Sequence, residues 1–210
     1  GPMFCEMISR ATRLLNGGRP DRAVALYVPL DNLYNTDLTF AAPTDAIARQ
    51  LTYNQVDYDY VWDGDITGMT VAADGITAAG GRAYTHLLVP PDAMISDTIR
   101  SQMDALDHDR GIVQQVQEDT LCELIRPLRE SDSFLNIVSE DVPVAMRRRT
   151  AENGATVCLF LNESETAENL TLRLGCQARV HEMALDSGQM SCCAKGTAGS
   201  SLTIEFQRAQ

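Results

Sequence analysis

Two short apolar runs, each closed by a proline, place the strongest constraint on the fold of this chain. Residues 22–30 read Arg-Ala-Val-Ala-Leu-Tyr-Val-Pro-Leu, and residues 84–92 read Tyr-Thr-His-Leu-Leu-Val-Pro-Pro-Asp. A run of this length without polar alternation is typical of a strand that is buried on both faces, as in a parallel sheet. Both runs lie between helix-like segments, which predicts an open α/β sheet whose function resides at the carboxyl ends of its strands.

The segments around these runs follow the order of a doubly wound sheet. Residues 4–15 carry apolar side chains every three or four positions and end at Gly17-Gly18, which predicts an amphipathic helix. The other expected helices cover residues 44–54, 96–106 and 120–128, and the other expected strands cover residues 58–62 and 111–116. We therefore predict a doubly wound α/β domain with a parallel sheet over residues 3–139.

The pattern changes near residues 139–142, where the helical periodicity ends. Short strands separated by turn-forming residues replace it, and they are expected at residues 144–149, 156–161, 169–174, 178–184 and 202–206. This spacing of strands and turns is typical of antiparallel sheets packed face to face. We therefore predict a small antiparallel β-sandwich domain over residues 140–210.

The net charge and the cysteine spacing limit which binding partners and which cellular compartment are expected. The 210 residues carry a formal net charge of −12, which argues against binding to phosphate backbones. The sequence contains neither an apolar stretch of membrane-spanning length nor a visible signal peptide, so we expect no nucleic-acid and no membrane partner. The six cysteines lack paired CxxC spacing, which favours reduced, mostly buried thiols and a cytoplasmic location, with Cys192-Cys193 in an exposed loop.

The first half of the chain resembles a domain of large bacterial glycoside hydrolases. In those proteins a helix with an arginine and paired leucines leads through glycine and proline into a strand that ends in Tyr-Pro. Here residues 8–15 match the helix, Gly18 and Pro20 match the link, and residues 24–29 match the strand. Residues 56–61 and 84–91 resemble the second and third strands of the same domain. The resemblance implies a flavodoxin-like or class I glutamine-amidotransferase-like fold, as found in trimeric β-galactosidases and α-L-rhamnosidase-like enzymes.

The second half of the chain resembles the β-sandwich that follows this domain. The matching stretches are Arg147–Thr150 with Gly154, Leu159–Ser164, and Ala178–Met183 with Asp186–Gly188. The catalytic barrel of those enzymes supplies both catalytic carboxylates, and its motifs do not occur in these 210 residues. The resemblance therefore implies a non-catalytic structural or interaction region with no catalytic residue of its own. Its expected partners are the barrel of the parent enzyme or further copies of the chain, and its expected ligand is a carbohydrate.

An alternative interpretation is a stand-alone α/β domain that binds or hydrolyses a small molecule at its own switch point. The candidate ligand-binding residues are then Tyr27, Asp31 and Asp92, at the carboxyl ends of the two best strands. Active amidotransferase-like proteins place a cysteine on a sharp elbow after a strand, whereas Val89 is followed here by Pro-Pro-Asp-Ala. Cys122 falls within an expected helix, where a buried side chain is the usual environment, so we predict no cysteine nucleophile.

Two other sequence patterns each have a plainer explanation than a binding site. Residues 63–74 place aspartate, threonine and glycine at positions of a calcium-loop template, but the same residue types dominate ordinary turns. Trp62, close to Tyr58 and Tyr60, has the chemistry to stack on a sugar ring, but aromatic packing on an edge strand is the favoured explanation of the pattern. The three histidines show no spacing of metal ligands, and we expect neither a metal nor a cofactor.

Overall fold

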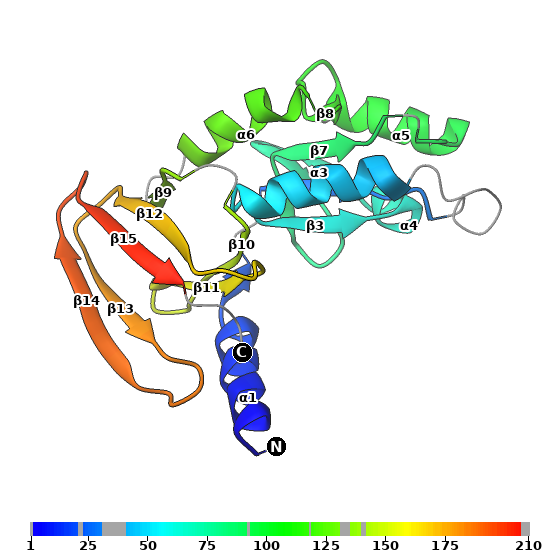
Figure 1. The fold of residues 1–210 in the computed structure, drawn as a ribbon. Coiled ribbons are helices and arrows are strands. Elements are labelled where there is room, and N and C mark those ends of the chain that lie inside the picture. The colour runs from blue at the N-terminus through cyan, green and yellow to red at the C-terminus, as the bar shows by residue number, and fades with distance from the viewer. Residues whose placement is uncertain are drawn as a thin grey trace. The chain divides into compact units, whose positions relative to one another are not determined.

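The computed structural model describes residues 2–20, 23–30, 41–91, 93–117, 119–130, 135–139 and 142–206 (Figure 1). Its contacts divide the chain into two compact units. The parallel unit consists of Arg22–Leu51 and Val56–Ile125, and the antiparallel unit consists of Gly1–Asp21, Thr52–Gln55 and Arg126–Gln210.

A sheet of four parallel strands forms the centre of the parallel unit, in the order β3-β2-β7-β8. The strands are β2 (Val24–Tyr27), β3 (Tyr58–Val61), β7 (His86–Val89) and β8 (Val113–Gln115). Strand β2 lies between β3 and β7, and all four of its residues are buried. The apolar run that predicted a strand buried on both faces thus forms an inner strand of this sheet, and the α/β class is confirmed.

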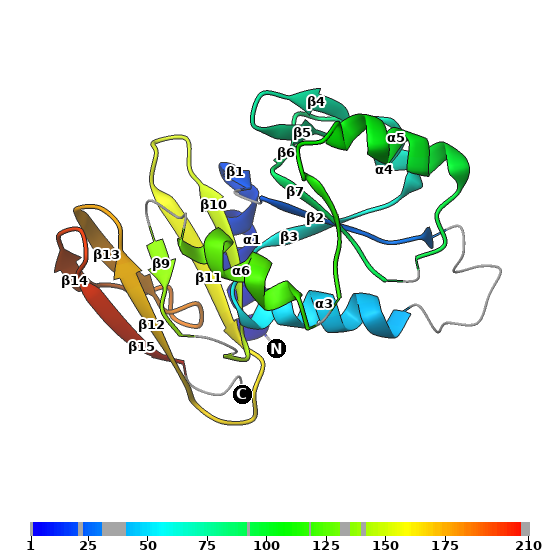
Figure 2. The same ribbon diagram turned by 90° about the horizontal axis from the view of Figure 1, so that it is seen from above.

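Helices cover both faces of this sheet (Figure 2). They are α3 (Ala41–Tyr53), α4 (Asp63–Thr67), α5 (Asp97–Asp107) and α6 (Leu121–Glu130), the last of which runs into the antiparallel unit. Helix α5 starts as predicted, because the Ser96 hydroxyl accepts a hydrogen bond from the Ile99 amide at 3.4 Å. Helix α3 starts three residues before the predicted Thr44, with Pro43 in its first turn, where a helix needs no amide hydrogen.

The segment between β3 and β7 folds as α4 followed by a small antiparallel sheet. The strands of this sheet are β4 (Thr70–Ala72), β5 (Gly75–Thr77) and β6 (Ala83–Tyr84). Gly75 has a φ of 154°, and a Cβ atom there would lie 2.1 Å from the Tyr84 carbonyl oxygen. The Arg110 guanidinium donates to the carbonyl oxygens of Ala72 at 2.8 Å and Ala73 at 2.6 Å, which holds the β4–β5 turn.

The core of the parallel unit joins one face of the sheet to α4, α5 and the small sheet. Its largest fully buried members include Tyr27, Ile66, Ile76, Tyr84 and Leu87. The buried face of α5 presents side chains at intervals of three and four residues, namely Ile99, Met103 and Leu106. The hydrophobic periodicity of this segment therefore predicted its buried face correctly.

The antiparallel unit contains three sheets, with strand orders β1-β10-β11, β15-β12-β9 and β13-β14. The strands are β1 (Arg19–Pro20), β9 (Leu135–Ile137), β10 (Val144–Thr150), β11 (Thr156–Asn162), β12 (Glu168–Leu174), β13 (Ala178–Met183), β14 (Met190–Gly196) and β15 (Ser201–Phe206). Val144, Leu170 and Leu172 lie in its core. The predicted loop at Cys192-Cys193 is wrong, because these residues lie in β14 and His181 of β13 pairs with Cys192.

Residues from both ends of the chain meet within the antiparallel unit. Helix α1 (Pro2–Asn16) leads into β1, which pairs with β10 through Arg19 opposite Thr150. The Arg10 guanidinium donates to the carbonyl oxygens of Leu185 at 2.7 Å and Asp186 at 2.5 Å, in the turn between β13 and β14. The contacts therefore group α1 with the C-terminal strands, whereas the sequence pattern placed residues 3–139 in one domain.

Among the described helices, none has the length and hydrophobicity required to cross a membrane.

Candidate functional site

The carboxyl edge of the parallel sheet is the place where a doubly wound fold binds its ligands, and β2 ends there with Tyr27. The Tyr27 side chain is 1% exposed, and its hydroxyl donates a hydrogen bond of 2.5 Å to the Asp63 Oδ1 atom. Asp63 is the first residue of α4 and follows the end of β3 by two positions. Two neighbouring strands thus bring a phenol and a carboxylate together at this edge.

The backbone beyond the strands is also fixed. The Val28 amide donates to the Val61 carbonyl at 2.8 Å, so the pairing of β2 with β3 continues past Tyr27. On the other side of the sheet the Val116 amide donates to the Val89 carbonyl at 3.0 Å. Pro29 follows β2, Pro90 follows β7, and both prolines are buried. The backbone hydrogen bonding between the strands ends at these residues, because proline has no amide hydrogen.

The structure describes the position of one of the three predicted ligand-binding residues. Tyr27 lies at the carboxyl edge as expected, whereas Asp31 and Asp92 lie outside the described residues. The sequence pattern pointed to Asp63 only as part of a calcium loop, and not as a neighbour of Tyr27. Its position directly after the edge strand was the signal that could have identified it.

A second polar cluster connects β3 to the small sheet. The Tyr84 hydroxyl donates to Asp59 Oδ2 at 3.1 Å, and Arg82 lies 3.9 Å from Asp59 and 3.8 Å from Asp65. The Arg82 side chain is 41% exposed and both ion-pair distances are long, so these ion pairs add little to stability. The cluster instead determines the position of the Asp59 carboxylate on the edge strand.

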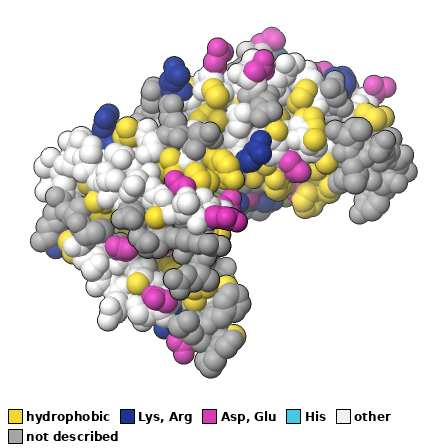
Figure 3. Space-filling model, in the orientation of Figure 1, with side chains coloured by type: hydrophobic (Ala, Val, Ile, Leu, Met, Phe, Trp, Pro, Cys, Tyr) yellow, Lys and Arg dark blue, Asp and Glu magenta, His cyan; other side chains and the backbone are white. Residues whose placement is uncertain are grey.

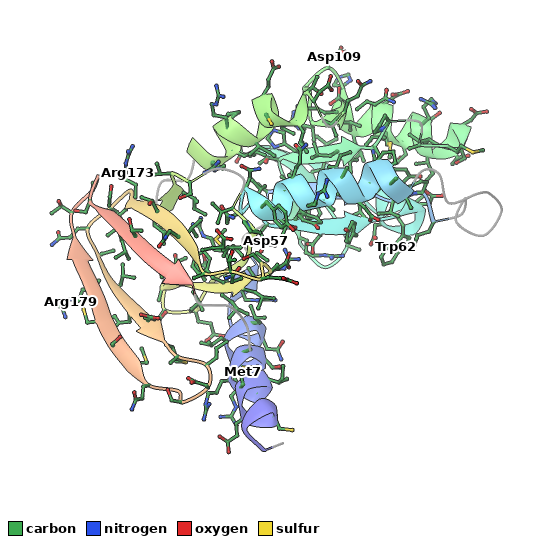
Figure 4. All side chains as sticks on the ribbon, viewed as in Figure 1. Met7, Asp57, Trp62, Asp109, Arg173 and Arg179 are labelled. Atoms are coloured by element: carbon green, nitrogen blue, oxygen red, sulfur yellow. The ribbon has the colours of Figure 1, made fainter. Side chains whose placement is uncertain are left out.

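Three aromatic residues alternate along the edge strand and the residue after it. Tyr58 is 8% exposed, while Tyr60 and Trp62 are each 47% exposed. The rings of Tyr58 and Tyr60 meet edge to face, with centroids 5.3 Å apart and an angle of 86° between their planes. Figure 4 labels Trp62 where β3 leads into α4, and Figure 3 shows hydrophobic side chains at the surface in this region. Packing therefore explains Tyr58 but leaves Tyr60 and Trp62 open to solvent.

The calcium-loop template at residues 63–74 corresponds to a different local structure. Asp63 starts α4, and Asp74 lies in the turn between β4 and β5. The Thr67 hydroxyl donates to the Asp63 carbonyl at 2.7 Å, as a helical threonine does. Within the described part of the chain, no three His, Cys, Asp or Glu side chains are grouped as metal ligands would be.

His86 starts β7, at the end of the strand opposite the carboxyl edge. Its Nδ1 atom lies 2.8 Å from the Thr85 hydroxyl, within hydrogen-bond distance. Burial lowers the pKa of His86 below its usual value, because the charged imidazolium loses hydration there. The arrangement is that of a structural, hydrogen-bonded histidine.

The cysteines differ from the prediction of mostly buried thiols. Cys5, Cys122 and Cys192 are exposed, and Cys158 and Cys176 are half-buried. In α6 the buried positions are Leu121 and Ile125, four residues apart, and Cys122 lies outside this buried stripe. The predicted burial of Cys122 is therefore wrong.

An open hollow of about 660 Å³ lies in the antiparallel unit. It is lined by Gln177, Ala178, Arg179, Gly196, Thr197 and Ser200. A general acid with a paired carboxylate, which glycosidic cleavage requires, does not occur among these lining residues. The hollow therefore offers hydrogen-bonding groups but no hydrolytic chemistry.

Comparison with solved structures gives a likeness to a rhamnosidase. Neither the protein-family models nor the curated proteins match this sequence. The structure of a rhamnosidase from Novosphingobium sp. PP1Y is similar to this chain, with a TM-score of 0.59 and 13% sequence identity. The match covers 99% of this chain and 24% of the rhamnosidase. The chain shares its fold with part of a glycoside hydrolase. It spans about a quarter of the length of that enzyme.

Proposed function

We propose that this chain is a non-catalytic accessory region of a bacterial glycoside hydrolase and that it buttresses or oligomerises a catalytic barrel. The observation that carries the proposal is that both units together, 99% of the chain, match one part of a rhamnosidase. Because the match extends through both units, it supports a shared order of the two units along the chain. A match to the α/β domain alone would be weaker support, because many unrelated proteins share such a domain.

The strand order supports the finer assignment of the parallel unit. Counted along the chain, its parallel strands are β2, β3, β7 and β8, and in the sheet they take the order second, first, third, fourth. This order is that of the flavodoxin-like class of doubly wound folds. The switch point of such a sheet lies between the first and third strands, here β2 and β7, next to Tyr27.

The proposal is tested by assaying the purified chain on nitrophenyl glycosides, including the α-L-rhamnoside and the β-D-galactoside. We expect no release of nitrophenol by the chain alone, and hydrolysis by a longer native protein that includes a barrel. Sedimentation of both proteins then measures whether the accessory region forms oligomers. Turnover by the chain alone, or a native protein without a barrel, would contradict the proposal.

A second candidate function is a small-molecule site at the switch point, and the Tyr27–Asp63 hydrogen bond favours it. A buried phenol that donates to a half-buried carboxylate has the chemistry to orient a polar ligand. In this case the chain alone would turn over a substrate, and Asp63→Asn would abolish the activity while the chain stays folded. The glycoside assay with this variant therefore separates the two candidates.

A further inference from the structure

We propose that Tyr60 and Trp62 form a stacking platform for a neutral pyranoside at the edge of the parallel sheet. The strand geometry supplies the first reason. Side chains two positions apart on an extended strand point to the same side, so Tyr60 and Trp62 lie on one face of β3 and its extension. Each of the two is 47% exposed, so their rings present an open aromatic surface.

Contacts with buried neighbours hold the tyrosine ring. Tyr58 is 8% exposed and meets Tyr60 edge to face, at a centroid distance of 5.3 Å. The Tyr58 hydroxyl also lies 3.5 Å from the Tyr60 hydroxyl. A ring that is held by a buried neighbour loses less conformational freedom when a ligand stacks on it, which favours binding.

The start of α4 holds the tryptophan. The Trp62 amide donates to Asp65 Oδ2 at 3.3 Å, which fixes the backbone at this position. A Cβ atom at Gly64 would lie 3.2 Å from the indole Nε1 atom, so the absence of a side chain there lets the indole lie close to the first turn of the helix. The platform therefore consists of two rings whose positions the fold determines.

The charges around the platform favour a neutral ligand. The parallel unit has five basic and 16 acidic side chains, a net charge of −11, which repels phosphates, uronates and other anions. Asp59 alternates with Tyr60 along β3 and therefore faces the other side of the sheet, and Arg82, within 4 Å of both Asp59 and Asp65, offsets part of their two negative charges. A neutral sugar places its apolar C–H face on the rings and keeps its hydroxyl groups in water.

The fluorescence of the full chain provides a direct test, because Trp62 is its single tryptophan. The probes are methyl α-L-rhamnopyranoside and methyl β-D-galactopyranoside, with galacturonate and tetramethylammonium as charged probes. The choice of sugars rests on the proposed function. We expect a saturable change in Trp62 emission with at least one neutral glycoside, with a Kd on the order of 1–10 mM, as befits a small ligand on an open surface.

Substitutions test whether the glycoside binds at the platform. Tyr60→Ala keeps the reporter and is expected to weaken binding at least about fivefold, because it removes half of the platform. Val71→Ala is the matched control, since Val71 is a 51% exposed hydrophobic side chain on another strand of the same unit, and binding should change by less than about twofold. N-acetyltryptophanamide controls for effects of the sugars on free indole, and melting curves confirm that the variants are folded.

Three outcomes would overturn the platform. They are no saturable response to either glycoside well above the expected Kd range, a response only to a charged probe, and equal weakening by Tyr60→Ala and Val71→Ala. Absence of sugar binding leaves the accessory role untouched, because the hydrolysis assay tests that role. Conversely, nitrophenol release by the chain alone would refute the accessory role and leave the platform standing.

Discussion

At the scale of single residues, the bond between Tyr27 and Asp63 shows how the sheet creates a polar site from a buried strand. Tyr27 ends a run of four buried residues, yet its hydroxyl has a carboxylate partner at 2.5 Å. A buried phenol requires such a partner, because an unsatisfied hydroxyl inside a protein costs free energy. The need of Tyr27 for an acceptor therefore fixes the position of Asp63 as well.

Tyr27→Phe removes this bond and leaves the Asp63 carboxylate without its donor. We expect the free energy of unfolding to fall by about 1–2 kcal/mol, as for a buried hydrogen bond to a charged group. Urea titration followed by Trp62 fluorescence measures the change. Tyr60→Phe is the control, because the Tyr60 side chain is 47% exposed, and it should change stability by less than about 0.5 kcal/mol. Equal effects of the two substitutions would refute the role given to the Tyr27 hydroxyl.

At the scale of elements, the sequence predicted most accurately the helices and strands that are determined by a local pattern of residues. The apolar runs predicted β2 and β7, and Ser96 followed by spaced apolar residues predicted α5. The small sheet and β14 were missed, because their segments lack a clear strand pattern of their own and form strands by pairing with a neighbouring segment, β4 with β5, β5 with β6 and β14 with β13. Gly75, for example, lies close to Tyr84 in the structure. The residues next to Gly75 in the sequence give no indication of this contact.

The same distinction applies to the candidate site. The rule that strand ends carry function identified Tyr27, since the strand itself was visible in the sequence. The partner Asp63 lies 36 positions along the chain and reaches Tyr27 only because β2 and β3 pair side by side. The sequence showed the alternation of aromatic residues in β3 but did not show which of them are exposed. Their exposure depends on which helix covers each ring.

Gly75→Ala tests the close approach that closes the small sheet. A Cβ at this position would lie 2.1 Å from the Tyr84 carbonyl oxygen, and the φ of 154° is itself unfavourable for alanine. We expect a loss of more than about 3 kcal/mol in the free energy of unfolding, measured by urea titration. Gly80→Ala is the matched control, because Gly80 has a φ of 83° but open space around it, and its cost should stay near 1 kcal/mol. Similar losses at both glycines would contradict the steric explanation.

At the scale of the whole molecule, the antiparallel unit is discontinuous in sequence. It combines residues 1–21 with residues 126–210, and the parallel unit occupies most of the chain between them. The contacts that join the ends include the pairing of β1 with β10 and the bonds of Arg10 to the turn after β13. The stability of the C-terminal strands is therefore expected to depend on residues at the start of the chain.

Arg10→Ala tests this dependence. It removes two hydrogen bonds to the carbonyl groups of Leu185 and Asp186, so hydrogen exchange in β13 and β14 should accelerate by about tenfold. Mass spectrometry of peptides that cover residues 178–196 measures the rates. Arg13→Ala, an exposed position of the same helix, is the control and should leave these rates unchanged. Unchanged exchange in Arg10→Ala would show that α1 does not support the turn.

The pairing of β1 with β10 also has a consequence for synthesis on the ribosome. Arg19 emerges about 130 residues before its partner Thr150, so the first strand waits unpaired while the entire parallel unit is translated. The parallel unit has all of its residues by Ile125 and can fold first, whereas the antiparallel unit can close only after residues 126–206 have been made. During that interval the amphipathic α1 lacks the strands with which it packs, and its apolar face stays open to other chains and to chaperones.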